Sequence, residues 1–203
     1  MRKKPFLIAT DMEGVLTPEV WINVARRTGI EKLKLTTRDI NNYDKLMRYR
    51  LRILAEHKIK LSDIRAVIAT MEPLPGAKTY LDWIRANYEL IILSDTFYEF
   101  ARPFMKKLGY PTLFCHTLET DKNNMIIDYH LRIKDGKKKA VLNLKKLGFK
   151  VMAIGDSYND TTMLKAADQG LLFKAPPAVK KEFPRFPTAE TYTEAKKIIK
   201  QTV

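Results

Sequence analysis

The sequence predicts a doubly wound α/β fold, in which helices cover both faces of a mainly parallel sheet. Three aliphatic runs are hydrophobic at every position, a pattern typical of strands that are buried on both faces. These runs occupy residues 6–9, 90–93 and 151–154. Each run ends in a short polar tip that contains an aspartate, and stretches of helical character follow or separate the runs.

Four helices are expected around these strands, at residues 76–87, 97–108, 137–147 and 159–168. In doubly wound sheets, ligands bind beyond the carboxyl ends of the strands. The polar tips of the three strands should therefore meet at one edge of the sheet. This arrangement would bring Asp11, Ser94 and Asp156 into one cluster.

A long insertion, residues 17–75, separates the first strand from the second. Its helical periodicity predicts a helical cap over the sheet edge. Thr17 followed by Pro18 is the expected start, as an N-cap with proline at the first helical position. The turn-forming sequence at residues 72–76 is expected to return the chain to the core.

A second and smaller insertion is predicted at about residues 113–133. Two strand-like segments there flank a polar turn at residues 121–124, which is typical of a β-hairpin. With the cap at residues 17–75, the catalytic core would comprise residues 1–16 and 76–203, the hairpin included.

Composition excludes several classes of protein. The hydrophobic content of 45% suits a globular core and is too high for a disordered chain. The longest aliphatic run, Leu90 to Leu93, is too short to span a bilayer, and the basic N-terminus lacks the apolar core of a signal peptide. The single cysteine, Cys115, cannot form an internal disulfide and is interpreted as a core residue. We therefore expect a cytoplasmic protein with no membrane partner.

The formal net charge of +14 allows two interpretations. Lysines concentrated between residues 134 and 150 could form a nucleic-acid surface. The alternative is a solvated face that attracts small anionic substrates. The sequence contains no RGG tract, zinc-finger spacing or RRM signature, so we expect no nucleic-acid partner.

The motif DMEGVLTPE, residues 11–19, carries the first candidate chemistry. Asp11 and Glu13 lie two residues apart just past a buried strand, where they can serve as nucleophile and general acid. Gly14 would let the backbone turn sharply at this point. Taken alone, the pair could equally be a chance acidic loop.

The motif GDSYND, residues 155–160, adds a second set of polar groups at another strand tip. Asp156 and Asp160 offer hard oxygen ligands of the kind that Mg²⁺ prefers. Asp160 could instead stabilise the first turn of the following helix. The segment Leu93 to Thr96 offers a hydroxyl and backbone amides, which suit either an anion site or an ordinary helix N-cap.

The cap offers one further candidate. On a helix over residues 40–54, the apolar side chains fill one arc and Arg50 lies near the middle of that arc. A guanidinium on an inward face must find an anion. The anion could be the carboxylate of a structural ion pair, or a substrate carboxylate bound by the bidentate fork.

Together these pieces resemble the haloacid-dehalogenase superfamily of phosphohydrolases. The order is DxEGxL, LSDT, a lysine and GDSxND, and the match spans nearly the whole chain. The closer resemblance is to phosphoserine phosphatases, and within them to the bacterial branch that also acts as a phosphoserine:homoserine phosphotransferase. It is carried by DMEGVLTPEVW, TTRDI, RLRILAEH, ILSDTFYEF and GDSYNDTTML. One departure is Glu13, which stands where the superfamily usually has aspartate; the bifunctional branch carries the same glutamate.

The resemblance implies a Rossmann-like core of this superfamily and an aspartyl-phosphate mechanism. Asp11 would attack phosphorus, and Glu13 would protonate the leaving seryl oxygen and then take a proton from the acceptor. Asp11, the backbone carbonyl of Glu13 and Asp156 would hold Mg²⁺, with Asp160 in the outer shell. The family places such enzymes in serine and amino-acid biosynthesis.

The resemblance also implies how the substrate is held. Ser94, the backbone of Asp95, Asn159 and a lysine would bind the phosphoryl oxygens. Family spacing to the following helix selects Lys137 as that lysine, although Lys134, Lys138 and Lys139 also precede this helix. In the cap, Arg50 would bind the carboxylate and Glu19 the amine of phosphoserine; Glu19 could instead simply complement the helix dipole behind Pro18.

Other interpretations remain open from the sequence. The same chemistry could serve a nucleotide or sugar phosphate, and a basic nucleic-acid-binding protein with a decayed site is the remote alternative. The sequence does not rank water against homoserine as the acceptor, nor monomer against homodimer. The histidines at 57, 116 and 130 show no pairing and are predicted to be structural, and the cluster Phe97, Tyr98 and Phe100 is predicted to be core.

Overall fold

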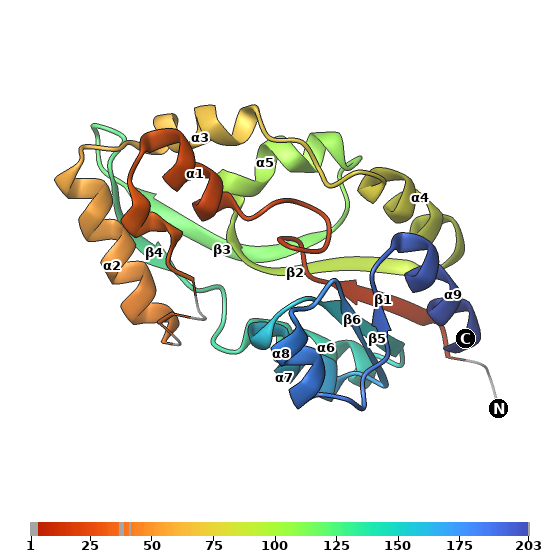
Figure 1. The fold of residues 1–203 in the computed structure, drawn as a ribbon. Helices are drawn as coiled ribbons and strands as arrows, with labels where there is room; N and C mark the ends of the chain where they lie inside the picture. Colours follow the sequence, from red (N-terminus) through yellow and green to blue (C-terminus); the bar gives the residue numbers. More distant parts are fainter. Residues whose placement is uncertain (1–3, 37–38, 41, 203) are drawn as a thin grey trace.

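A single seven-stranded sheet runs through the part of the chain that the structure describes, residues 4–36, 39–40 and 42–202 (Figure 1). The structure is a computed structural model. Its strands lie in the order β4-β3-β2-β1-β5-β6-β7, and only the β3–β4 pair is antiparallel. Their bounds are β1 Phe6–Thr10, β2 Glu89–Phe97, β3 Leu113–Thr120, β4 Ile126–His130, β5 Lys150–Gly155, β6 Gln169–Phe173 and β7 Thr188–Ala189.

The three aliphatic runs form the adjacent strands β2, β1 and β5 at the centre of this sheet. Thr10 at the end of β1 is in register with Ile92 and with Ile154, so the polar tips of all three strands emerge at one edge. Every residue of β1 is buried. Because side chains alternate along a strand, Ile8 packs into the core on one face while Leu7 and Ala9 pack on the other.

Helices cover both faces, which confirms the doubly wound fold. Figure 1 shows α4 and α5 on one side of the sheet and α6 and α7 on the other. The predicted helix 159–168 is shorter than expected, because a 3₁₀ turn at Tyr158–Asp160 precedes α7. The bounds are α4 Ala77–Asn87, α5 Tyr98–Lys107, α6 Gly136–Lys146, α7 Thr161–Ala166, α8 Pro177–Glu182 and α9 Tyr192–Thr202.

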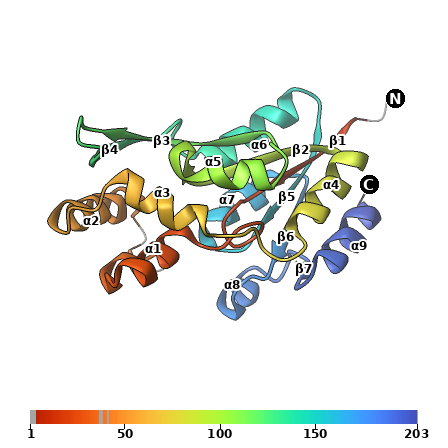
Figure 2. The same cartoon turned by 90° about the horizontal axis from the view of Figure 1, so that it is seen from above.

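The segment between β1 and α4 contains α1 Val20–Thr28, the 3₁₀ helix η1 Glu31–Lys34, α2 Tyr43–Glu56 and α3 Leu61–Ala69. Both views place these helices at the end of the molecule that also holds the β3–β4 hairpin (Figures 1 and 2). Apolar side chains of this segment share one hydrophobic cluster with the core helices, and the rings of Trp21 and Phe100 meet edge to face at 5.5 Å. The division of the chain at residues 17–75 stays a prediction.

The predicted start of the first cap helix is wrong. The helix begins at Val20 with Glu19 as its N-cap residue, not at Thr17 and Pro18. Thr17 instead closes a tight turn: the Gly14 amide donates to the carbonyl of Thr17 at 2.8 Å, and the Thr17 amide donates to the carbonyl of Met12. The motif TTRDI and the predicted helix 40–54 include residues 37, 38 and 41, which lie outside the described residues; the described helix begins at Tyr43.

The predicted hairpin is present as β3 and β4, but it is not separate from the core sheet. Leu113 in β3 pairs in parallel with Ile92 of β2, so the hairpin extends the edge of the sheet. The cap helix α2 lies against the hairpin, where Arg48 pairs with Asp128 at 2.7 Å. Across the described ranges, no helix is both long and apolar enough to cross a membrane.

Candidate active site

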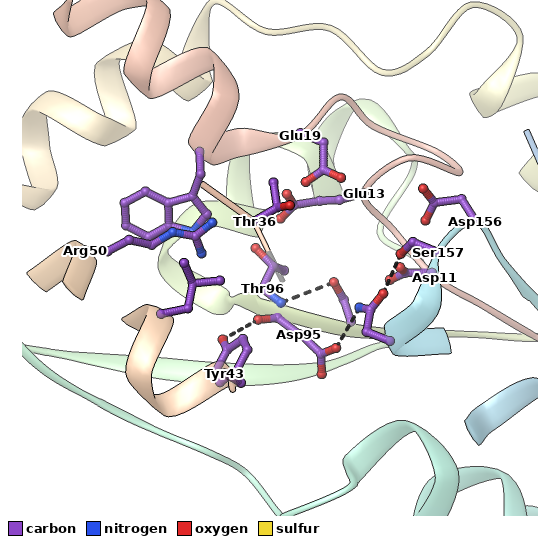
Figure 3. Close-up of a pocket in the computed structure, with 14 residues that line it drawn as sticks. Asp11, Glu13, Glu19, Thr36, Tyr43, Arg50, Asp95, Thr96, Asp156 and Ser157 are labelled. Carbon is purple, nitrogen blue, oxygen red and sulfur yellow. Dashed lines mark hydrogen bonds between the residues drawn. The ribbon is translucent and has the colours of Figure 1, made fainter. Parts of the chain in front are cut away.

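A pocket with a volume of about 90 Å³ opens where β1, β2 and β5 end, and the cap segment forms its far side (Figure 3). The structure brings together here almost all residues singled out from the sequence. Those lining the pocket are Asp11, Glu13, Glu19, Arg50, Ser94, Asp95, Asp156 and Asn159. Lys137 and Asp160 do not line it, yet their side chains contact each other and lie against Asp11 and Asp156.

Asp11 is buried directly after β1 and is held on both carboxylate oxygens. The Met12 amide donates to Oδ1 at 2.7 Å, and Lys137 Nζ lies 3.0 Å from Oδ2. Burial, and then the nearby Asp160 carboxylate, raise the pKa of Asp11 well above its usual value. Any positive charge placed beside the Asp11 carboxylate would therefore stabilise its ionised form.

Three buried carboxylates, those of Asp11, Asp156 and Asp160, have oxygen atoms within 4.8 Å of one another. This is an all-oxygen donor set suited to a hard divalent cation such as Mg²⁺. Asp160 is held on both oxygens, as Asp11 is: its Oδ1 accepts from Lys137 at 2.8 Å and its Oδ2 accepts from the Asp156 amide at 3.0 Å. The second of these hydrogen bonds ties the backbone of Asp156 to Asp160.

Gly14 permits this arrangement. Its φ of +79° is in the left-handed region, and a Cβ at this position would lie 2.5 Å from Oδ2 of Asp156. The peptide that joins Glu13 to Gly14 therefore lies beside the Asp156 carboxylate. The backbone that follows β1 therefore lies close to the carboxylate cluster. The Glu13 carbonyl has to lie there if it is to bind the same metal ion.

Lys137 is the lysine that reaches the site. It is 5% exposed, and its Nζ lies 2.8 Å from Asp160, 3.0 Å from Asp11 and 3.4 Å from Asp95. Burial opposes its charge, but the three carboxylates outweigh burial and raise the pKa of Lys137. The other candidates, at 134, 138 and 139, are exposed. The buried ammonium of Lys137 thus partly neutralises the charges of these three carboxylates.

The irregular last part of β2, where its register with β3 shifts between Leu93 and Phe97, presents groups suited to an anion. The Thr96 amide donates to Ser94 Oγ at 3.3 Å, which folds the backbone around the pocket. Asn159 Nδ2 donates to Asp95 Oδ2 at 3.0 Å. Although burial opposes ionisation, Lys137 and the hydrogen bonds from His116 and Asn159 hold the pKa of Asp95 below its usual range, so its carboxylate stays charged.

Glu13 has a different environment from Asp11. Its Oε2 accepts from the Val20 amide at 3.0 Å, at the N-terminus of α1. Burial first, and then the neighbouring carboxylate of Glu19, raise the pKa of Glu13 to about 7. A carboxyl with this pKa exchanges its proton near neutral pH, which suits a general acid and base.

Arg50 is buried at the opposite end of the pocket from Asp11 and Asp156 (Figure 3). Its guanidinium lies 4.5 Å from the centre of the Trp21 ring, and Nη2 donates to the carbonyl of Leu35 at 2.8 Å. Within the described ranges its Nε has no hydrogen-bond partner and no carboxylate forms an ion pair with it. The structural ion pair considered from the sequence is therefore absent among these residues.

Comparison with known proteins identifies the family. Residues 7–168 match the model of the haloacid dehalogenase-like hydrolases. The chain belongs to this family. It is 56% identical to a phosphoserine phosphatase of Pseudomonas syringae pv. tomato, over 92% of this chain and 79% of that protein. It is 55% identical to phosphoserine phosphatase ThrH of Pseudomonas aeruginosa, over 92% of this chain and 91% of that protein.

Solved structures of phosphoserine phosphatases share the fold. A substrate-bound phosphoserine phosphatase complex superposes with a TM-score of 0.78 at 20% identity, covering 98% of this chain and 99% of that one. A phospho-aspartyl intermediate analogue of a phosphoserine phosphatase gives a TM-score of 0.73 at 22% identity, with 89% and 91% coverage. This haloacid dehalogenase-like hydrolase therefore has the architecture of those enzymes.

Some residues that line the site of this hydrolase were not candidates from the sequence. Trp21, Thr36 and Tyr43 line the pocket. Tyr43 shares the apolar arc of its helix with Arg50, seven residues on, and that spacing could have revealed it. Two of the histidines predicted to be structural contact carboxylates: His116 Nε2 lies 3.6 Å from Asp95 Oδ1, and His130 pairs with Glu119 at 2.8 Å.

Proposed function

We propose that this hydrolase is a Mg²⁺-dependent phosphoserine phosphatase that works through an aspartyl-phosphate on Asp11. One observation carries the proposal: a single small pocket has the Asp11 carboxylate at one end and, at the other, the Arg50 guanidinium, which forms no ion pair with a carboxylate among the described residues. Phosphoserine has the matching pair of groups, a phosphate and a carboxylate. The names of the two Pseudomonas relatives support the same substrate.

At the phosphoryl end, Asp11 Oδ attacks phosphorus and the bond to the seryl oxygen breaks. Glu13, with a pKa of about 7, gives its proton to the leaving oxygen and then takes one from the incoming acceptor. Ser94, the amide of Asp95, Asn159 and Lys137 hold the phosphoryl oxygens. Positioned positive charge and hydrogen-bond donors supply most of the catalysis in such transfers.

The residues that would hold Mg²⁺ are Asp11, Asp156 and the backbone carbonyl of Glu13. When bound there, the ion supplies positive charge beside the phosphoryl oxygens and helps to orient them. Asp160 keeps this arrangement in place, since it accepts from the Asp156 amide and pairs with Lys137.

At the amino-acid end, Arg50 would bind the substrate carboxylate through its planar fork. Trp21 packs on one face of the guanidinium, and Arg50 Nε, which has no hydrogen-bond partner among the described residues, could donate to the ligand. Glu19 lines the same pocket and offers a carboxylate to the α-amino group. The pocket would thereby select amino-acid phosphates over nucleotide or sugar phosphates.

We also propose that homoserine can replace water as the acceptor. Homoserine carries the same amino and carboxylate groups as serine, so Arg50 and Glu19 would bind it with its hydroxyl directed towards phosphorylated Asp11. The test is incubation with phosphoserine and Mg²⁺, with and without homoserine, while inorganic phosphate and phosphohomoserine are measured. No turnover of phosphoserine under either condition would rule out the proposed function. We place the enzyme in the cytoplasm, as a buried and unpaired Cys115 suits a reducing compartment.

The variant Arg50→Ala tests substrate recognition. Hydrogen bonds to charged groups contribute about 1.5–3 kcal/mol, so kcat/KM for phosphoserine should fall by roughly 10- to 150-fold. Hydrolysis of p-nitrophenyl phosphate, which has no amino-acid part, should stay within about threefold of the wild-type rate. Arg52→Ala is the matched control, because Arg52 is exposed on the same helix. An unchanged kcat/KM for phosphoserine in Arg50→Ala would mean that Arg50 does not recognise the substrate, and would favour a different phosphate ester.

A further inference from the structure

Two cavities meet at the active site. The substrate pocket adjoins a larger cleft, with a volume of about 700 Å³, between the cap helix α2, the hairpin and the start of α6. Three residues line both cavities: Tyr43, Asp95 and Asn159. Together with Lys137, which lines the wider cleft and lies 3.0 Å from Asp11, they form the partition between the place where Asp11 would be phosphorylated and that cleft.

Hydrogen bonds hold this partition closed. The Tyr43 hydroxyl donates to the backbone carbonyl of Asp95 at 2.8 Å, and Asn159 donates to the Asp95 carboxylate at 3.0 Å. Figure 3 shows Tyr43 and Asp95 joined in this way along one wall of the pocket. Of these bonds, the one from Tyr43 links the cap to the last part of β2.

The ring of Tyr43 is fixed from behind. It packs edge to face against His116 at 6.2 Å and against Tyr129 at 5.9 Å between ring centres. The Tyr129 hydroxyl in turn donates to Asp44 at 2.6 Å, and this hydrogen bond links the hairpin to α2 next to Tyr43. Burial raises the pKa of Tyr43, and its phenol therefore stays a neutral donor.

We propose that Tyr43 is a positioning residue that closes the partition and so keeps water in the wide cleft away from phosphorylated Asp11. This inference rests on the proposed function. In the second half-reaction an oxygen attacks phosphorus, the bond to Asp11 breaks, and the proton of the attacking oxygen goes to Glu13. Water and an amino-acid alcohol compete for that step, and a closed partition favours the alcohol, which arrives through the substrate pocket.

The variant Tyr43→Phe removes only the hydroxyl. The carbonyl of Asp95 then lacks its partner, and the vacated space can admit a water molecule that hydrogen-bonds to this carbonyl. Water would thus enter the partition itself. The ratio of transfer to hydrolysis should fall by about 3- to 10-fold, the size of effect that one neutral hydrogen bond gives.

The readout is a product ratio that does not depend on the amount of folded enzyme. The protein is incubated with phosphoserine, Mg²⁺ and labelled serine, and label recovered in phosphoserine is divided by inorganic phosphate released. The matched control is Tyr49→Phe, a tyrosine on the same helix whose ring lies beside Arg52 and does not line the substrate pocket. Its ratio should equal that of the wild type.

A ratio within twofold of wild type in Tyr43→Phe overturns the inference while leaving the proposed function intact. If the wild type does not turn over phosphoserine, the proposed function fails instead, so the two failures are distinguishable. Should Tyr43→Phe not fold, Tyr129→Phe carries the same test. It removes the hydrogen bond to Asp44 that links the hairpin to α2 next to Tyr43, and should lower the ratio by about two- to threefold; an unchanged ratio would count against the inference.

Discussion

Replacement of Lys137 by methionine is the most direct test of how this site is held together. Methionine keeps the length and apolar stem of the side chain but removes its charge. Lys137 Nζ lies between 2.8 and 3.4 Å from the carboxylates of Asp160, Asp11 and Asp95, and the side chain is 5% exposed. Removal of one partner from a buried ionic cluster costs about 3–5 kcal/mol, because the remaining charges are left uncompensated.

For a chain of this size, such a loss corresponds to a decrease in Tm of roughly 6–20 °C. The loss should depend on pH. Burial raises the pKa of Asp11, and without Lys137 the pKa should rise further. A carboxyl whose pKa is raised in the folded state contributes stability below that pKa, and this contribution is lost as the pH rises through it. The variant should therefore be closest to wild type in acidic buffer.

Urea unfolding followed by circular dichroism measures this effect, with and without Mg²⁺ and in acidic and alkaline buffer. Lys139→Met is the control, since Lys139 is exposed on the same helix and should change the free energy of unfolding by no more than about 0.5 kcal/mol. Mg²⁺ should restore part of the stability of Lys137→Met, because it supplies charge to the same carboxylates. Equal stability of the two variants without metal would refute the reasoning.

Two further predictions concern the turn after β1. Gly14→Ala should weaken Mg²⁺ activation, because its Cβ would lie 2.5 Å from Asp156 in a left-handed conformation that costs about 1–2 kcal/mol; Gly148→Ala shares the conformation without a contact and should leave Mg²⁺ titrations unchanged. Glu13 has a pKa of about 7, so the rate of phosphoserine cleavage should fall as the pH rises above that value. Glu13→Gln should lose about 10²- to 10⁴-fold in rate together with this pH dependence, and a retained dependence would assign it to another group.

The meeting of the three strand ends at one edge of the sheet could be predicted because it follows from local sequence patterns. A run that is apolar at every position has to be buried on both faces, and parallel strands bring their carboxyl ends to one edge. This is why Asp11, Ser94 and Asp156 were expected in one place, where the structure brings them into one pocket. Family spacing towards the apolar stripe of α6 selected Lys137, which the structure places beside Asp11.

The residues that sequence reasoning missed depend on partners far along the chain. Tyr43 bonds to a carbonyl 52 residues away, and its place on the apolar arc of the helix does not reveal that partner. His116 gains its partner Asp95 only because β3 pairs with β2. The wrong prediction at Thr17 has a different origin. The sequence Thr17-Pro18 is typical of a helix start, but Thr17 instead takes part in a tight turn that the backbone conformation of Gly14 makes possible.

The hydrophobic cluster that joins the cap to the core has a consequence for how the molecule melts and evolves. Trp21 of α1 meets Phe100 of α5, and α3 packs on α5, so the apolar residues of the cap share one cluster with those on the adjoining face of the sheet. We expect one cooperative denaturation rather than two steps. A chimaera that grafts the cap of a distant relative onto this sheet would have to bring matching α5 side chains with it, which ties changes in substrate preference to changes in the scaffold beneath.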